Sequence, residues 1–329
     1  MKLHLDKDPF QTLLTVISEK ERIRADILEK DYYVTLMLKE LSDNQDQLPA
    51  YFKGGTALYK ALGSIRRFSE DIDLTVSVEG CSNSQAKRRL EHAANKYSYL
   101  SRTTNKSMEA NLKGSITSVY DYDSVINVGE DMLQRFQHVK VEATSFTVSE
   151  PYEPMLIEPV LYTKADKEQQ KILAEQYDVK PFLINTIKLE RIFVDKIFAA
   201  EFYFQRGNEK YFDVSKHLYD ITVLMNHEKI QNMFSNNNVF FEMISYKRTE
   251  EESRIGSNLS DMPFEDFSIL YNVRENEKLK DVFNNMQDIY VFDDSDKLEY
   301  DDMVNTLEQL RCILFALEPE QTESFDLNM

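Results

Sequence analysis

The stretch RRFSEDIDLTV, residues 66–76, alternates charged and apolar side chains where a buried strand begins. Asp71 and Asp73 stand one residue apart, with Ile72 between them. Because successive strand residues point to opposite faces, both aspartates share one face, ~6 to 7 Å apart along the chain. Charged groups beside an apolar layer are costly unless they are paired or bind a metal. Taken alone, the pair favours a strand end with solvated carboxylates, and the residues upstream turn the prediction to a carboxylate site.

Magnesium is the metal that this arrangement favours. Mg²⁺ binds through one or two carboxylates plus substrate phosphates, and a pair of such ions can clamp both oxygens in nucleotidyl transfer. A third carboxylate should come from a neighbouring strand. In HVKVEATSF, residues 138–146, alternation turns Lys140 and Glu142 away from the core, so Glu142 is the candidate third ligand. The alternative is a solvated strand glutamate beside a lysine.

A glycine turn lies just upstream of the aspartates. Gly54 and Gly55 separate the short apolar run AYFK from the helical stretch TALYKAL, which begins at Thr56. Such a turn exposes backbone N–H groups where a helix begins, and anions bind there. Alone it is more often a plain turn. Arg67 and Ser69 add a cation and a hydroxyl in the same short segment, which predicts a phosphate cradle beside a metal site.

Composition indicates an ordinary globular protein. The 329 residues suit one large domain or two smaller ones, and the two cysteines fit a reducing cytoplasm. No run approaches the ~18 apolar residues of a membrane span, and the N-terminus lacks a signal-peptide pattern. We expect a cytoplasmic protein with no membrane partner.

The formal net charge of −18 argues against general nucleic-acid binding, which needs a basic footprint. An RNA substrate would need a local basic strip. The best candidates for that strip are Lys87, Arg88 and Arg89 together with Arg66 and Arg67.

The fold class predicted from the patterns is α+β. Two amphipathic helices precede the glycine turn, residues 100–148 suggest antiparallel strands, and long helical periodicity begins near residue 181. Prolines between residues 151 and 159 mark the predicted boundary. We therefore expect a mixed or antiparallel sheet with flanking helices in residues 1–160, and a mainly helical domain in residues 161–329.

Several motifs together resemble one family. The combination KGGTAL…RFSEDIDL resembles the AbiEii abortive-infection toxins, within the polymerase-beta-like nucleotidyltransferase superfamily. ILEKDYYV, residues 27–34, is similar to that family's N-terminal element. IFVDKIFAA, residues 192–200, and VSKHLYDITVL, residues 214–224, resemble its third and fourth motifs, although Lys216 stands where the family often has arginine.

The resemblance implies an NTP-dependent nucleotidyltransferase core. It implies triphosphate binding by Gly54, Gly55 and Ser69, and magnesium coordination by Asp71 and Asp73.

For the helical domain, the resemblance implies that Lys196 contacts nucleotide phosphates and that Asp220 is the last acidic residue of the site. An ammonium supplies a point charge, and an aspartate can orient it or act on an acceptor hydroxyl. The expected cleft lies between the two domains. The expected function is a bacterial toxin with a cognate antitoxin, acting in phage defence by moving NMP from NTP to RNA at the tRNA 3′ end.

Two alternatives stay open. The enzyme could modify a protein or small-molecule hydroxyl, which the acidic net charge favours. The chain could instead be an inactive nucleotide-binding module that works through a partner. The retained Asp71, Asp73, Lys196 and Asp220 argue against that second alternative, because a dead site has little reason to keep its carboxylates together.

Overall fold

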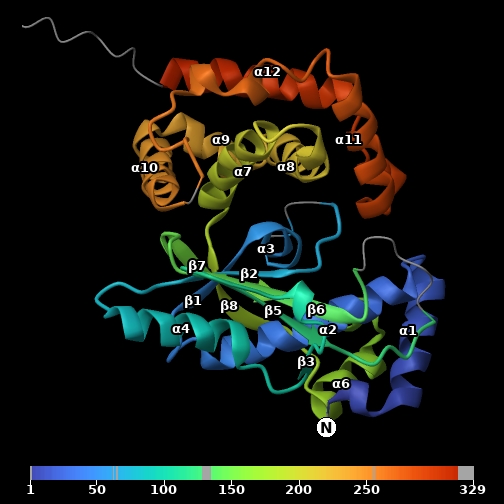
Figure 1. Cartoon of the computed structure of the whole chain (residues 1–329). Coiled ribbons are helices and arrows are strands. Elements are labelled where there is room, and N and C mark those ends of the chain that lie inside the picture. The colour runs from blue at the N-terminus through green and yellow to red at the C-terminus, as the bar shows by residue number, and fades with distance from the viewer. Residues whose placement is uncertain (1, 62, 64–65, 128–134, 255, 318–329) are drawn as a thin grey trace, which may run out of the picture. The chain divides into compact units, whose positions relative to one another are not determined.

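The chain forms two compact units, Met1–Lys188 and Leu189–Met329. The computed structural model describes residues 2–61, 63, 66–127, 135–254 and 256–317 (Figure 1). The first unit contains the sheet, and the elements of the second are helices. No helix in the described ranges is both long and apolar enough to cross a membrane.

A mixed sheet is the centre of the first unit. In the described residues it has eight strands in the order β3-β5-β6-β2-β1-β8-β7, with β4 paired to β5. β2 runs parallel to β6, and β1 parallel to β8, whereas β1–β2, β5–β6 and β7–β8 are antiparallel. The predicted α+β class with a mixed sheet is thus confirmed. The strand bounds are β1 Ala50–Lys53, β2 Ile72–Val76, β3 Ser101–Arg102, β4 Ala110–Leu112, β5 Ser115–Asp121, β6 His138–Thr144, β7 Tyr152–Ile157 and β8 Phe182–Ile187.

Helices cover both faces of this sheet. α2 and α4 pack on one face, and the short helix α3 lies over the other (Figure 1). α4 begins at a capping box in which Ser82 and Gln85 each satisfy the other's backbone N–H. The helices of the unit are α1 Lys7–Glu21, α2 Ala25–Asn44, α3 Gly54–Lys60, α4 Asn83–Asn95, α5 Val160–Lys164 and α6 Lys167–Tyr177, with 3-10 turns η1 Leu3–Leu5 and η2 Lys106–Met108.

The second unit is built on α7 and α8, which pack closely against each other. Apolar residues such as Phe193, Phe198 and Leu218 are fully buried there and form its core. Its helices are α7 Leu189–Phe204, α8 Tyr211–Leu224, α9 Glu228–Ser235, α10 Asn237–Ser253, α11 Glu277–Tyr290 and α12 Tyr300–Leu317, with 3-10 turns η3 Asn208–Lys210, η4 Phe264–Asp266, η5 Ser268–Leu270 and η6 Asp294–Asp296.

The boundary between the compact units lies at Lys188, later than the predicted residue 160. Residues 182–187 merge into the helical periodicity of the following segment, but they form strand β8. β8 pairs with β7 on one side and with β1 on the other, through Phe52 opposite Thr186. Pairing with distant strands therefore keeps this segment in the first unit.

Candidate active site

Three carboxylates lie on one face of the sheet. β2 and β6 are parallel neighbours, and their register places Asp73 beside Glu142. Asp71 directly precedes β2 and, by alternation, shares this face. Ile72 and Val141, which point to the other face, are fully buried. The structure thus brings the three predicted metal ligands to adjacent positions, with an apolar layer behind them.

Lys140 is the lysine beside this group. Its Nζ lies 3.4 Å from Oδ2 of Asp71. The Asp71 carboxylate, followed by Glu142 and Glu70, raises the pKa of the Lys140 ammonium against the opposing effect of burial. This side chain stays charged at neutral pH and partly neutralises the negative charge of the carboxylates.

The glycine turn packs directly against Asp73. Gly54 has a φ of +79°, and a Cβ added there would lie 2.1 Å from Oδ2 and 3.0 Å from Cβ of Asp73. Only glycine accepts both that backbone conformation and that close approach. The turn and the β2 carboxylate therefore form one packed unit.

The remaining predicted phosphate-binding residues gather around the next glycine. A Cβ added to Gly55 would lie 2.9 Å from Ser69 Oγ and 3.0 Å from Arg67 Nη2. The hydroxyl of Thr56 donates to Ser69 Oγ at 2.9 Å. The Arg67 guanidinium is buried, and its Nη1 donates to the carbonyl of Phe68. Arg67 is therefore buried beside the glycine turn and is not part of an exposed basic strip, which corrects that part of the sequence prediction.

The donor chemistry of this face fits a hard divalent cation. Carboxylate oxygens are the ligands that Mg²⁺ prefers, and the glycine turn keeps the backbone close to one of them. Within the described ranges, however, no three His, Cys, Asp or Glu side chains converge closely enough to hold a metal ion. The roles of Asp71, Asp73 and Glu142 as ligands stay a prediction.

Lys196 and Asp220 pair with each other in the second unit. Lys196 lies on α7 and Asp220 on α8, and Nζ is 2.9 Å from Oδ2. Both side chains are buried, at 7% and 0% exposure. Nearby, the ring of His217 stacks on Tyr203 with centroids 5.7 Å apart. The two predicted residues are therefore held in one geometry by a buried ion pair.

The EKDY element on α2, Glu29 to Tyr32, contains buried charges that were not predicted as site residues. Glu29 Oε1 accepts from the backbone N–H of Val125 at 2.7 Å. Lys30 is fully buried and donates to the carbonyls of Arg135 and His138, at 2.9 and 2.5 Å. Burial lowers the pKa of Lys30 to about 8. Lys30 thereby fixes the residues from which β6 starts.

The second half of the EKDY element contacts other segments. Asp31 pairs with Lys60 at 2.5 Å and accepts from the N–H of Val160 at 3.1 Å. The Tyr32 hydroxyl lies 2.9 Å from Nδ1 of His4. Three consecutive charged residues inside an apolar helix stripe are the sequence signal that could have identified this element.

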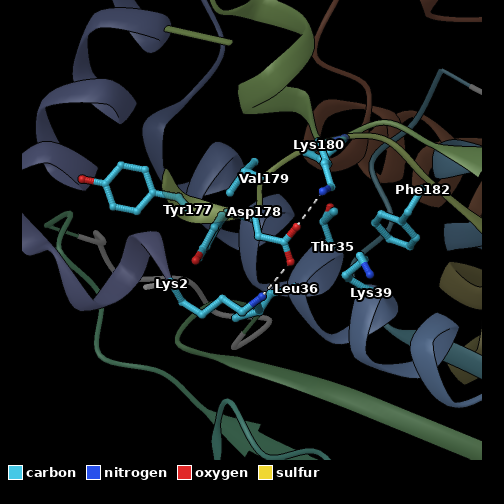
Figure 2. Close-up of a pocket in the computed structure, with 11 residues that line it drawn as sticks. Lys2, Thr35, Leu36, Lys39, Tyr177, Asp178, Val179, Lys180 and Phe182 are labelled. Atoms are coloured by element: carbon cyan, nitrogen blue, oxygen red, sulfur yellow. Dashed lines mark hydrogen bonds and ion pairs between the residues drawn. The ribbon is translucent and has the colours of Figure 1, made fainter. Parts of the chain in front are cut away.

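A pocket on the first unit is lined by none of the predicted site residues. Figure 2 shows the side chains that line it. Two of its lysines, Lys2 and Lys180, both pair with Asp178, at 3.3 and 3.2 Å. Lys39 pairs with Asp43. These charges already satisfy one another, so the pocket is no rival to the carboxylate face as a triphosphate site. Its lining is Lys2, Tyr32, Thr35, Leu36, Lys39, Pro159, Tyr177, Asp178, Val179, Lys180 and Phe182.

Comparison with known proteins gives a family match over most of the chain. The family described as nucleotidyl transferase AbiEii toxin, type IV TA system, matches residues 36–308. Among solved structures, the chain is similar to MenT4, a nucleotidyltransferase toxin from Mycobacterium tuberculosis H37Rv. That match has 12% identity and a TM-score of 0.45, and it covers 92% of this chain and 97% of the other. No curated protein matches the chain.

Proposed function

Because the chain belongs to the AbiEii family of nucleotidyltransferase toxins of type IV toxin-antitoxin systems, we propose that it transfers NMP from NTP to RNA, at the tRNA 3′ end. The acceptor hydroxyl would attack the α-phosphorus, a new phosphodiester would form, and pyrophosphate would leave. The family is the premise for the enzyme class. The observation that carries the assignment of the site is the register of Asp73 beside Glu142, next to the glycine turn.

We assign metal binding to Asp71 and Asp73, with Glu142 as third ligand. Bound there, Mg²⁺ would stabilise negative charge on the phosphates and on the attacking and leaving oxygens. The chain's own contribution is to fix Asp73 and Glu142 on neighbouring strands, and Asp71 directly before β2, with a buried apolar face behind them.

The cradle of Gly54, Gly55, Thr56, Arg67 and Ser69 would bind the triphosphate. Backbone N–H groups, two hydroxyls and a buried guanidinium are suitable donors to phosphate oxygens. The proposal also assigns residues of the helical unit to the reaction. Lys196, oriented by its ion pair with Asp220, would contact nucleotide phosphates as the resemblance implies.

The biological setting follows from the proposed substrates. NTP and tRNA are cytoplasmic, so we propose that the toxin acts there, in phage defence, under the control of an antitoxin. The acidic net charge of −18 means that tRNA would be held locally. Of the predicted basic strip, Arg89 donates through its Nη1 to the carbonyl of Ser77, and Lys87 pairs with Glu91 at 3.8 Å. The exposed Arg66 and Arg88 are therefore the better candidates for RNA contacts.

The test is transfer from each α-labelled NTP in turn to total cellular RNA with Mg²⁺. Wild type is compared with Asp71→Asn, and with Asp121→Asn as a matched control at an exposed strand end on the same sheet. Label in tRNA-sized RNA with wild type and the control, but not with Asp71→Asn, is the expected result. If label enters protein or small molecules instead, the acceptor is not RNA. Absence of any transfer by wild type would favour the nucleotide-binding module.

A further inference from the structure

A positively charged side chain sits among the carboxylates that the proposed function assigns to a metal. Lys140 precedes Glu142 by two residues on β6, so both side chains share one face. The Lys140 ammonium lies 3.4 Å from Asp71 Oδ2, and Glu142 and Glu70 also act on it electrostatically. This lysine therefore supplies charge where the metal would supply it.

The backbone that carries Lys140 is anchored, whereas its side chain has room to move. Lys30 donates to the carbonyls of Arg135 and His138, which fixes the start of β6 two residues before Lys140. The side chains of Lys140 and Asp71 are 34% and 37% exposed. A four-carbon stem on a fixed strand can move its ammonium by several ångströms without moving the strand.

We propose that Lys140 is the counter-ion of Asp71 until a metal-bound nucleotide binds. The Lys140 ammonium then moves from the Asp71 carboxylate to the triphosphate. This inference rests on the proposed function. A carboxylate oxygen that coordinates a divalent cation directly cannot keep an ammonium at the same position. The displaced ammonium is then close to a strongly anionic substrate, which it can contact as a point charge.

The exchange is energetically accessible. A partly exposed ion pair strengthens the association of its groups by a factor of only about 1.5 to 5. Lys140 therefore neutralises Asp71 before a nucleotide binds, without holding it so tightly that a divalent cation is excluded. The same weak pairing sets the size of the effects that a substitution should produce.

The experiment measures two affinities without measuring transfer. Mn²⁺ binding is followed by electron paramagnetic resonance, and binding of inorganic tripolyphosphate in the presence of Mg²⁺ by calorimetry, for wild type, Lys140→Met and Lys140→Arg. Lys106→Met is the matched control, because Lys106 also pairs with a carboxylate, Glu109, at 2.9 Å. Asp71→Asn reports whether the Mn²⁺ site is the expected one.

Opposite signs are expected for the two ligands. Lys140→Met should bind Mn²⁺ alone about 1.5- to 5-fold more tightly, because a competing cation is gone. It should bind tripolyphosphate roughly fivefold or more weakly, because a charged donor is lost. Lys140→Arg should stay close to wild type for Mn²⁺, and Lys106→Met should change neither affinity.

Each failure has a separate meaning. Asp71-dependent Mn²⁺ binding that Lys140→Met leaves unchanged or weakens would overturn the counter-ion role. Unchanged tripolyphosphate binding in Lys140→Met would overturn the transfer of Lys140 to the phosphates. Mn²⁺ binding in wild type that does not depend on Asp71 would overturn the proposed metal site itself, and this inference with it.

Discussion

Substituting alanine for Gly54 tests whether the glycine turn and Asp73 form one packed unit. An alanine at the left-handed φ of +79° costs about 1 to 2 kcal/mol in the backbone alone. The new Cβ would also lie 2.1 Å from Asp73 Oδ2, 2.8 Å from Cγ and 3.0 Å from Cβ, so rotation of the carboxylate cannot relieve the contact. Overpacking of this kind adds roughly 1 to 3 kcal/mol.

The variant Gly80→Ala distinguishes the cost of backbone strain from the cost of the overlap with Asp73. Gly80 has a φ of +68° in the same unit, and a Cβ there would meet nothing within 4 Å. Gly54→Ala should therefore be destabilised by about 1 to 3 kcal/mol more than Gly80→Ala, a difference of roughly 2 to 12 °C in Tm for a unit of this size. Both are measured by thermal unfolding.

Activity gives the second readout for these variants. Displacing Asp73 by an ångström or more should lower nucleotidyl transfer by about 100-fold in Gly54→Ala, measured below its Tm. Gly80→Ala should keep the wild-type rate. Equal destabilisation of the two variants, with transfer retained in Gly54→Ala, would refute the packing of Asp73 on the turn.

Further predictions concern the buried charges. Because Lys30 releases its proton near pH 8 when folded and near 10.5 when unfolded, stability rises with pH between these values. In urea unfolding, the free energy of unfolding of wild type relative to Lys30→Met should rise by about 2 kcal/mol from about pH 7.5 to about pH 9.5. A difference between the two proteins that does not change with pH would contradict this. Asp31→Ala, which leaves Lys60 buried without its ion partner, should cost ~3 to 5 kcal/mol in urea unfolding, and a cost below ~1 kcal/mol would count against the pair. Lys196→Met should cost a similar amount, and combining it with Asp220→Leu should cost less than the sum of the singles; additive costs would show that the two do not act as a pair.

Local alternation was enough to predict the carboxylate face. A strand period of two fixes Asp71 and Asp73 on one side. The same rule predicted that Glu142 points away from the core-facing side of its strand. The register that makes Glu142 the neighbour of Asp73 is a long-range property, yet it agrees with the expectation because β2 and β6 bury matching apolar residues such as Ile72 and Val141.

Long-range partners explain what the sequence did not reveal. Residues 182–187 form a strand because β1 and β7 flank them, although their pattern continues into a helix. Arg67 is buried against the glycine turn, although its sequence neighbours suggested an exposed basic loop. Lys30 is paired with carbonyls of residues 135 and 138, and no local pattern identifies such partners.

The most direct test of the central claim uses purified tRNA with its 3′ end either intact or oxidised by periodate, and the α-labelled NTP that supports transfer. Wild type is expected to label intact tRNA only, and Asp73→Asn is expected to label neither. Equal labelling of oxidised tRNA, or labelling that persists in Asp73→Asn, would contradict transfer to the 3′ hydroxyl by this carboxylate site.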